Sequence, residues 1–243
     1  MENNKVILIT GASRGIGREI ALAFAAPGNV IFINYIKDKA AALDAAVAVE
    51  KRGAAACVLQ ADVSDFSRVQ AMVKETAGKA GRIDVLINNA GITRNRSIIK
   101  MPPADWQDVM RTNLDGAFFL TRDCGALMAK NGGGAIINIA SVLGLRGAAG
   151  SANYAASKAG LVALTKSAAI ELGRFGVRVN AVLPGFHLTD MGKTASKDYL
   201  ERARAESVLG MTTDIAELAA FIVFLSKSLS VSGQVFNWDS RIL

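Results

Sequence analysis

The feature that most constrains this fold is the alternation of short apolar segments with longer stretches of helical pattern. The apolar segments are continuous, which is typical of strands buried on both faces of a parallel sheet. They span residues 6–10, 30–34, 56–60, 85–88, 135–140 and 177–183. The helical stretches span residues 16–25, 39–52, 66–80, 105–130 and 153–175, and a further helix at 214–225 precedes a last strand at 234–237.

This order predicts an α/β fold, a Rossmann-type doubly wound parallel sheet of about seven strands with helices on both faces. No linker-like segment, low-complexity run or repeat interrupts the chain, so we expect a single domain over residues 1–243. Its cofactor half is expected at about 1–140 and its catalytic and substrate half at about 141–243. Ligands of such sheets bind beyond the carboxyl ends of the strands, so residues that follow each strand are the candidates for function.

The composition favours a folded, cytoplasmic chain without a metal centre. Hydrophobic residues make up 51% of the chain and charged residues 20%, which permits a core and disfavours wholesale disorder. The apolar runs are too short for a signal peptide or a membrane span, so no membrane partner is expected. Cys57 and Cys124 lie in apolar surroundings and are expected to be buried thiols. One histidine and two cysteines cannot form a zinc site, so no metal is predicted.

The net charge of +7 and the pI near 9.6 favour an anionic partner, such as a phosphorylated cofactor, an acidic carrier protein, nucleic acid or a membrane surface. Arg94, Arg96, Lys130 and Arg174 are candidates for contact with a carrier protein, and ordinary solvated charge is the simpler alternative. The basic residues are scattered and the chain holds no recognisable nucleic-acid module, so no nucleic-acid partner is expected.

A glycine-rich turn, TGASRGIG at 10–17, joins the first strand to the first helix. Glycines there permit a tight turn and let backbone N–H groups approach a pyrophosphate, which a helix N-terminus also favours. The spacing is GxxxGxG, and its place between a strand and a helix is what favours nucleotide binding. The residues expected to contribute are Gly11, Ser13, Arg14, Gly15, Ile16 and Gly17.

The end of the second strand bears on which dinucleotide the turn would bind. That strand ends at Asn34, where an acid would bind the ribose hydroxyls of NAD. Lys37 follows, and Arg14 is available in the first turn, so two cations favour the 2′-phosphate of NADP. Asp38 is the evidence against this choice, and NAD(H) stays open as the alternative.

Two further strand ends carry candidate cofactor contacts. Asp62 and Val63 follow the third strand, where Asp62 is expected to accept from the adenine amine; capping of the next helix by Asp62 or Ser64 is an equally good reading. The turn Asn88-Asn89-Ala90-Gly91 (88–91) follows the fourth strand, and we expect it to border the cofactor.

A serine, a tyrosine and a lysine supply the candidate chemistry. Tyr154 and Lys158 are four residues apart on a helix, so their side chains share one face. A phenol titrates near ~10, and a unit charge about 4 Å away at an effective dielectric of ~20 would lower that pKa by up to ~3 units. Such a tyrosine can act as a general acid near neutral pH. Ser141 ends the fifth strand and is placed to hydrogen-bond a substrate carbonyl oxygen.

Taken together, these motifs resemble the classical short-chain dehydrogenases/reductases, nearly from end to end. The resemblance rests on TGASRGIG (10–17), DV (62–63), NNAGITR (88–94), Asn113 in RTNLDGAF, INIAS (137–141), YAASK (154–158) and PGFHLTDM (184–191). Within that superfamily the chain is most similar to the bacterial 3-oxoacyl carrier-protein reductases of fatty-acid synthesis. The resemblance implies NADPH-dependent reduction of a 3-oxoacyl thioester and a homotetramer assembled partly through the helices that carry Asn113 and Tyr154.

The resemblance also assigns roles to single residues. Tyr154 is the implied proton donor, Lys158 lowers its pKa and holds the nicotinamide ribose, and Ser141 orients the carbonyl. Asn113 supports a water chain that reprotonates the site through Lys158. The expected NADP(H)-binding set is Gly11, Ser13, Arg14, Gly15, Ile16, Gly17, Asn34, Asp62, Val63, Asn89, Ala90, Gly91, Tyr154, Lys158, Pro184, Gly185 and Thr189.

The carboxyl end departs from the family pattern, because LGMTTD (209–214) replaces Arg-x-Gly-x-Pro-Glu and NWDSR (237–241) replaces a Gly-Gly turn. These changes leave the acyl substrate open, so another carbonyl (an acyl-CoA, a quinone, a sugar or a small ketone) is the main alternative. A non-catalytic nucleotide-sensing or nucleic-acid-binding protein is a weaker one. His187 follows the Pro-Gly pair, where it is either a substrate-binding or pH-sensing group or an inert loop residue.

Overall fold

A computed structural model of the chain describes residues 4–187, 201 and 204–242. Within these residues, seven strands form one parallel sheet in the order β3-β2-β1-β4-β5-β6-β7. The strands are β1 (Val6–Ile9), β2 (Val30–Tyr35), β3 (Ala55–Gln60), β4 (Val85–Asn88), β5 (Gly134–Ile139), β6 (Val177–Leu183) and β7 (Val235–Asn237). The predicted doubly wound sheet is confirmed, and its strand order reverses direction between β1 and β4.

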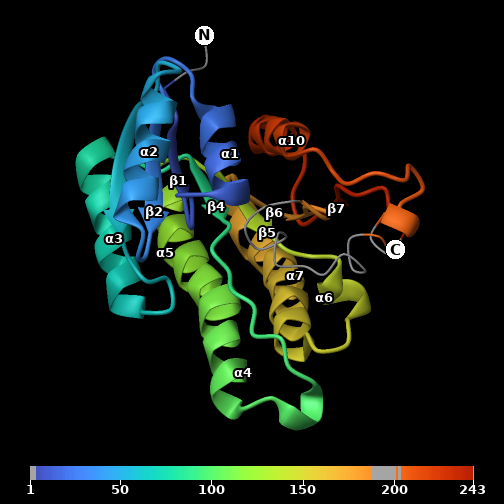
Figure 1. Cartoon of the computed structure of the whole chain (residues 1–243). Helices are drawn as coiled ribbons and strands as arrows, with labels where there is room; N and C mark the ends of the chain where they lie inside the picture. The colour runs from blue at the N-terminus through green and yellow to red at the C-terminus, as the bar shows by residue number, and fades with distance from the viewer. Residues whose placement is uncertain (1–3, 188–200, 202–203, 243) are drawn as a thin grey trace.

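Helices cover both faces of the sheet (Figure 1). One face packs against α1 (Gly15–Phe24), α2 (Lys39–Glu50) and α10 (Ile215–Lys227), through a core that includes Ile20, Ile31 and Ile222. The other face packs against α3 (Phe66–Ala80), α5 (Gly116–Lys130) and α7 (Ala152–Leu172), through a core that includes Leu86 and Leu120. Because β1, β4 and β5 are buried on both faces, their sequences are continuously apolar, as the parallel-sheet pattern requires.

The predicted helix at 105–130 is interrupted, which corrects the expectation of one continuous helix. The segment consists of α4 (Pro103–Met110), a π-helical turn η2 (Arg111–Asp115) and α5. At its start α5 lies very close to the loop after β3, and a Cβ on Gly116 would lie 2.8 Å from the Val63 carbonyl oxygen. Single π turns are frequent at functional sites, and this one contains Asn113.

Three short helices of the described chain lie in the connections between the main elements. The short helices η1 (Ile98–Lys100), α6 (Leu143–Arg146) and η3 (Gly173–Phe175) complete the described elements. The segment before α4 projects from the body of the molecule at the lower end of Figure 1. Both η1 and α6 follow strands at their carboxyl ends, so they lie on the side where the candidate functional residues gather.

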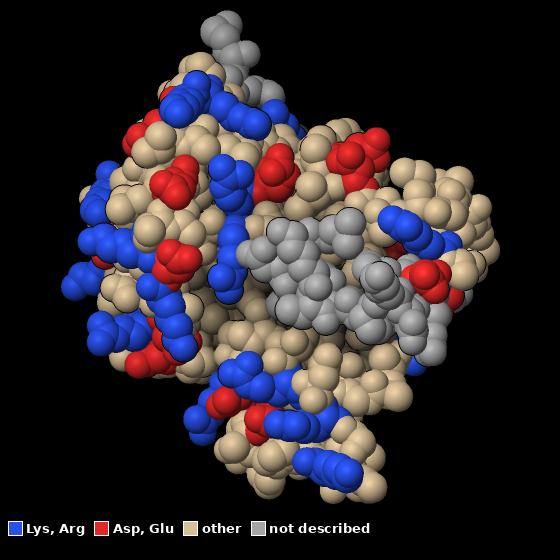
Figure 2. Space-filling view, viewed as in Figure 1, with Lys and Arg blue, Asp and Glu red and all other residues tan. Residues whose placement is uncertain are grey.

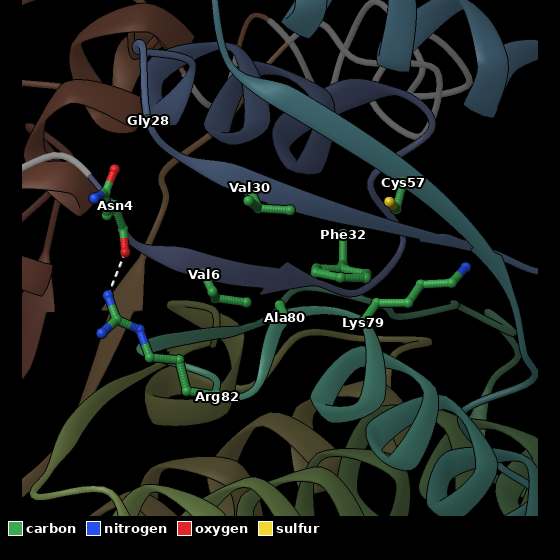
Figure 3. Close-up of a pocket in the computed structure, with 9 residues that line it drawn as sticks. All are labelled: Asn4, Val6, Gly28, Val30, Phe32, Cys57, Lys79, Ala80 and Arg82. Atoms are coloured by element: carbon green, nitrogen blue, oxygen red, sulfur yellow. Dashed lines mark hydrogen bonds between the residues drawn. The ribbon is translucent and has the colours of Figure 1, made fainter.

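A depression of about 440 Å³ lies near the amino ends of the strands, away from the candidate functional residues. Its lining includes Val6, Phe32 and Cys57 (Figure 3). Arg82 closes one side of it by donating to the Asn4 carbonyl oxygen. Cys57 is half-buried there, so the expectation of a fully buried thiol is wrong at this position. Its strand, β3, is an edge strand of the sheet, which leaves the cysteine partly open to solvent. Cys124 is buried, and burial raises the pKa of its thiol.

Candidate active site

The glycine-rich turn is shaped to bring backbone close to a ligand. Gly11 has a φ of +61°, and its N–H donates to Asn34 Oδ1 at 3.2 Å. A Cβ on Gly17 would lie 2.5 Å from Asn89 Nδ2 and 2.6 Å from the Gly11 carbonyl oxygen, so only glycine fits. Arg14 precedes α1 without capping it by its side chain, which leaves the first N–H groups of the helix open to an anion. These features fit a dinucleotide pyrophosphate.

The end of β2 contains a structural asparagine and two exposed charges of opposite sign. Asn34 is buried, and its amide nitrogen donates to the carbonyl oxygens of β3 and of Ala61, so here it fixes the loop. Lys37 and Asp38 are exposed. Asp38 caps α2 by accepting from the Ala41 N–H at 2.9 Å. The acid that counted against a phosphorylated ribose therefore has a local structural partner.

The loop after β3 places Asp62 and Val63 beside the start of α5. Asp62 accepts from both the N–H and the hydroxyl of Ser64, at 2.9 and 2.7 Å. Asp65 is the residue that caps α3, by accepting from the Ser67 and Arg68 N–H groups. The alternative reading of Asp62 or Ser64 as the helix cap is therefore wrong.

The turn after β4 is anchored to the glycine-rich turn. Asn89 Nδ2 donates to the carbonyl oxygens of Thr10 and Gly11, at 2.8 and 3.1 Å. The Thr10 hydroxyl accepts from the N–H groups of Asn89 and Ala90. Gly91 continues the turn toward the candidate catalytic residues, since a Cβ there would lie 3.3 Å from Asn113 Oδ1 and 3.8 Å from Lys158 Nζ. The two halves of the expected cofactor site thus form one connected loop system.

Ser141 and Tyr154 lie at the carboxyl edge of the sheet, on segments that meet there. Ser141 follows β5, and its Oγ accepts from the Leu143 N–H at 3.2 Å, which leaves the hydroxyl hydrogen to donate elsewhere. Tyr154 is partly buried in the first turn of α7. The helix α6 packs closely on α7 because Gly144 lacks a side chain, and a Cβ there would lie 2.7 Å from the Lys158 carbonyl carbon. This close packing fixes Ser141 relative to α7.

Lys158 is buried, with 4% of its surface exposed, on the same face of α7 as Tyr154. Its Nζ lies 5.7 Å from the centroid of the Tyr154 ring and donates to the Ile139 carbonyl oxygen at 2.5 Å. Desolvation by burial lowers the pKa of Lys158 from 10.5 to about 8. At pH 7 the side chain is therefore still mostly protonated, and its charge lies in a medium of low dielectric. Lys158 thus lies beside the Tyr154 ring, and its effect on the phenol stays a prediction.

Asn113 lies in the π turn and is 1% exposed. Its Oδ1 accepts from the Ile92 N–H at 2.8 Å, and its Nδ2 donates to the Ile92 carbonyl oxygen at 3.0 Å and to Ser157 Oγ at 3.1 Å. The side chain is thus fully engaged with protein groups. The water chain that the family resemblance implies for Asn113 stays a prediction.

Sequence reasoning missed Asn153, which is 0% exposed and adjoins the candidate catalytic residue Tyr154. Its Nδ2 donates to the carbonyl oxygens of Arg94 and Asp105, at 3.0 and 3.2 Å, and its Oδ1 accepts from the Tyr154 N–H at 2.8 Å. The only available signal was a polar residue at a helix start, where an ordinary helix cap is the usual explanation.

The loop after β6 contains the Pro-Gly pair and the single histidine. Gly185 has a φ of +78°, and a Cβ on it would meet Thr213 and the Trp238 carbonyl oxygen. His187 is buried rather than exposed at the mouth, and its Nε2 interacts with the Pro184 carbonyl oxygen. Burial lowers the pKa of His187, against the opposing effect of the Pro184 and Thr213 main chain. Thr189 lies outside the described residues.

The unusual carboxyl-terminal segment folds back onto this loop. Asp239 and Arg241 form an ion pair whose side chains are 5% and 4% exposed. Trp238 stacks on Phe221 of α10, with ring centroids 4.5 Å apart. Ser207 bonds to Ser240, which ties the segment at 204–211 to the chain end. The departures from the family pattern therefore build one wall next to the Pro-Gly loop.

The four basic residues that are candidates for contact with a carrier protein do not form one cluster. Arg94 and Arg96 lie near the catalytic edge, since the Arg96 N–H donates to the Gly150 carbonyl oxygen beside the start of α7. Lys130 is the last residue of α5, and Arg174 follows the far end of α7. Helix α7 has 21 residues, which is about 30 Å of helix. Lys and Arg side chains are spread over the face shown in Figure 2, with acidic groups between them.

Two features are absent from the described residues. No helix in that part of the chain is both long and apolar enough to cross a membrane. No three or more His, Cys, Asp or Glu side chains gather there as metal ligands would.

Comparison with known proteins agrees with the geometry of the site. Curated 3-oxoacyl-(acyl-carrier-protein) reductases from Staphylococcus aureus and Synechocystis sp. are each 42% identical over 240 residues, 98% of this chain and 97% of the relative. A solved structure from Sinorhizobium meliloti, described as a short-chain alcohol dehydrogenase, has a TM-score of 0.93 and 31% identity, and covers 98% of this chain and 96% of that one. Residues 5–200 match the family described as short chain dehydrogenase. The chain therefore belongs to the short-chain dehydrogenase family.

Proposed function

We propose that this oxidoreductase catalyses the NADPH-dependent reduction of 3-oxoacyl carrier-protein thioesters to 3-hydroxyacyl thioesters in fatty-acid synthesis. The observation that carries the proposal is 42% identity to reductases of that name over 98% of the chain, with Ser141, Tyr154 and Lys158 assembled at one edge of the sheet. A bound nicotinamide supplies the hydride. This chain binds the ketone, orients it and delivers the proton.

Each catalytic residue has a role that its surroundings support. The Ser141 hydroxyl donates to the carbonyl oxygen of the substrate, where negative charge develops. Tyr154 transfers its phenolic proton to the same oxygen. Lys158, still protonated at neutral pH, stabilises the tyrosinate that remains. The proton then returns to Tyr154 through Lys158, along the route that the family resemblance implies for Asn113.

The choice of NADPH over NADH rests on Arg14 and Lys37. Both are exposed beside the turn where an adenosine ribose would lie, and Asp38 is engaged with the Ala41 N–H. Two cations suit a 2′-phosphate through charge-assisted hydrogen bonds. Lys37→Ala is expected to raise KM for NADPH several-fold and to leave KM for NADH unchanged. An equal effect on both cofactors would contradict this assignment.

A direct assay tests the reaction and separates it from the alternatives. Oxidation of NADPH is followed with acetoacetyl carrier protein, acetoacetyl-CoA and simple ketones at matched concentrations, with NADH in parallel. The proposal predicts the highest kcat/KM for the carrier-protein thioester with NADPH. Preference for a simple ketone would move the enzyme to another substrate class. In Tyr154→Phe, turnover is expected to fall by roughly 10²–10⁴-fold, because the proton donor is gone, while cofactor binding survives.

A homotetramer is supported by two separate sets of exposed apolar side chains. On one side α5 and α7, which both run antiparallel to the strands, expose Phe118 near the start of one and Ile170 near the end of the other. A two-fold axis across these helices would bring Phe118 against the partner's Ile170. On the other side, Phe224 and Leu229 are 67% and 84% exposed.

Two isologous interfaces of this kind generate a tetramer of D2 symmetry. Ile170→Asp and Phe224→Asp are each expected to leave dimers, because each removes one of the two interfaces. Sedimentation of the two variants and the unaltered protein tests this arrangement. A monomeric unaltered protein would contradict it.

A further inference from the structure

Two buried asparagines connect the segment after β4 to the helix of the catalytic tyrosine. Asn113 binds the main chain of Ile92 through both its amide atoms. Asn153 binds the Arg94 carbonyl oxygen, two residues further along. The segment they hold continues from the Asn89–Gly91 turn, which is expected to border the cofactor. These two amides therefore link Tyr154 to the cofactor side of the site.

The hydrogen bonds close into a ring. Asn113 Nδ2 donates to Ser157 Oγ, and the Ser157 hydroxyl donates to the Tyr154 carbonyl oxygen at 2.8 Å. On the other side, the Tyr154 N–H donates to Asn153 Oδ1. Both main-chain polar groups of Tyr154 are thus tied, by separate routes, to one short segment. The ring runs through Ile92, Asn113, Ser157, Tyr154, Asn153 and Arg94.

Asn153 is the side chain of the ring that joins three segments of the chain. Its two N–H groups reach two different segments, the loop at Arg94 and the first turn of α4 at Asp105. Its oxygen accepts from the third segment, α7. The side chain is 0% exposed, and removing it takes one hydrogen-bond partner from the Tyr154 N–H and one from each of the Arg94 and Asp105 carbonyl oxygens. An amide supplies the two donors and the acceptor in one planar group.

We infer that Asn153 is a positioning residue for the reduction, which sets the position of the Tyr154 phenol relative to Lys158 and the cofactor side of the site. The expected loss of turnover rests on the proposed function, whereas the positioning of Tyr154 by Asn153 does not. Misplacement of a catalytic group by about 1 Å can cost on the order of 100-fold in rate.

The test measures Tyr154 directly as well as turnover. The ionisation of Tyr154 is followed by the ultraviolet absorbance of tyrosinate, as the difference between each protein and its Tyr154→Phe counterpart, without substrate. In Asn153→Ala the phenol pKa is expected to rise toward its ordinary value, because Tyr154 is no longer held beside Lys158. With the carrier-protein thioester, kcat is expected to fall about 10- to 100-fold with little change in KM for NADPH.

Two further variants keep the result interpretable. Asn29→Ala is the matched control: Asn29 is buried, accepts from the Lys5 N–H and donates to the Phe24 carbonyl oxygen, at the opposite edge of the sheet. It is expected to lose stability without changing the Tyr154 titration or kcat. Asn153→Asp keeps the acceptor for Tyr154 and loses both donors, and it serves if the alanine variant does not fold.

Each outcome bears on the inference. A raised phenol pKa in the Asn153 variants alone supports it, even if the thioester is not turned over, in which case only the proposed function fails. An unchanged titration, an equal change in Asn29→Ala, or failure of both Asn153 variants to fold would overturn it, because Asn153 would then act only in folding.

Discussion

The ammonium of Lys158 lies 5.7 Å from the centroid of the Tyr154 ring and at the same time donates to the Ile139 carbonyl oxygen. The main chain at the end of β5 therefore fixes the charge that the tyrosine needs. Since Ser141 follows two residues after Ile139, one strand end positions both the lysine and the serine. The proposed proton donor, cation and carbonyl-binding hydroxyl thus lie on α7 and just after β5.

Replacing Lys158 by methionine tests the role of this charge. Methionine keeps much of the apolar stem and removes the ammonium, so reduction is expected to fall at least about 100-fold at pH 7. In the unaltered protein the rate should decline as pH rises through about 8, where Lys158 loses its proton. The measurement is kcat/KM against pH, with Lys74→Met, an exposed lysine on α3, as the control. An alkaline limb that persists in Lys158→Met would belong to another group.

The same burial makes a prediction about stability. The pKa of Lys158 is lowered from 10.5 to about 8 in the folded protein, so between these pH values the unfolded chain binds more protons. The free energy of unfolding therefore rises with pH across this window, by up to about 3 kcal/mol from this residue. Below about pH 8, the folded protein carries the full free-energy cost of burying the charged Lys158 side chain.

Denaturant unfolding of Lys158→Met and the lysine protein, both in a Tyr154→Phe background, isolates this contribution. The methionine variant is expected to have its largest stability advantage near pH 7.5, and most of the advantage should be lost by pH 10. Other titrating groups contribute equally to both proteins and cancel. A difference in stability that does not vary with pH would show that Lys158 is not desolvated as the fold indicates.

Gly17→Ala tests the close packing of the glycine-rich turn. The new Cβ would lie 2.5 Å from Asn89 Nδ2, so the two loops must separate, at a cost of about 1–3 kcal/mol. The affinity for NADPH is expected to fall about tenfold, measured by the fluorescence of the bound cofactor. Gly78→Ala is the control, because that helical glycine has nothing within 4 Å of an added Cβ. It should gain up to about 1 kcal/mol of stability and bind NADPH normally.

The sheet could be predicted from the sequence because strands buried on both faces appear as short, continuous apolar runs. The apolar runs at β1, β4 and β5 are short, continuous and followed by helices, and each predicted strand was found. The common face of the candidate catalytic residues Tyr154 and Lys158 could also be predicted, because their spacing on one helix determines it. Local sequence rules work where the function depends on one helix or one strand end.

The interruption at η2 and the role of Asn153 were beyond local rules. The residues at 111–115 carry no proline or other breaker, so the pattern reads as continuous helix, while the close approach of Gly116 to Val63 arises only from tertiary packing. Asn153 draws its partners from Arg94 and Asp105, at sequence distances of 59 and 48. His187 likewise interacts with residues that are distant in the sequence, Thr213, Asp214 and Asp239.

The buried pair of Asp239 and Arg241 gives a final prediction, about the segment that departs most from the family. Removing one partner strands an uncompensated charge in a region where both side chains are about 5% exposed, so Arg241→Met is expected to cost about 3–5 kcal/mol. Replacing both, as Asp239→Asn with Arg241→Met, removes the stranded charge and should recover much of that loss. Denaturant unfolding of the three variants and a double-mutant cycle measure the coupling. Because this pair lies behind the Pro184–Gly185 loop, the double variant should keep its NADPH affinity if the pair acts only in stability. A weakened affinity in the stable double variant would show that the pair also shapes the cofactor site.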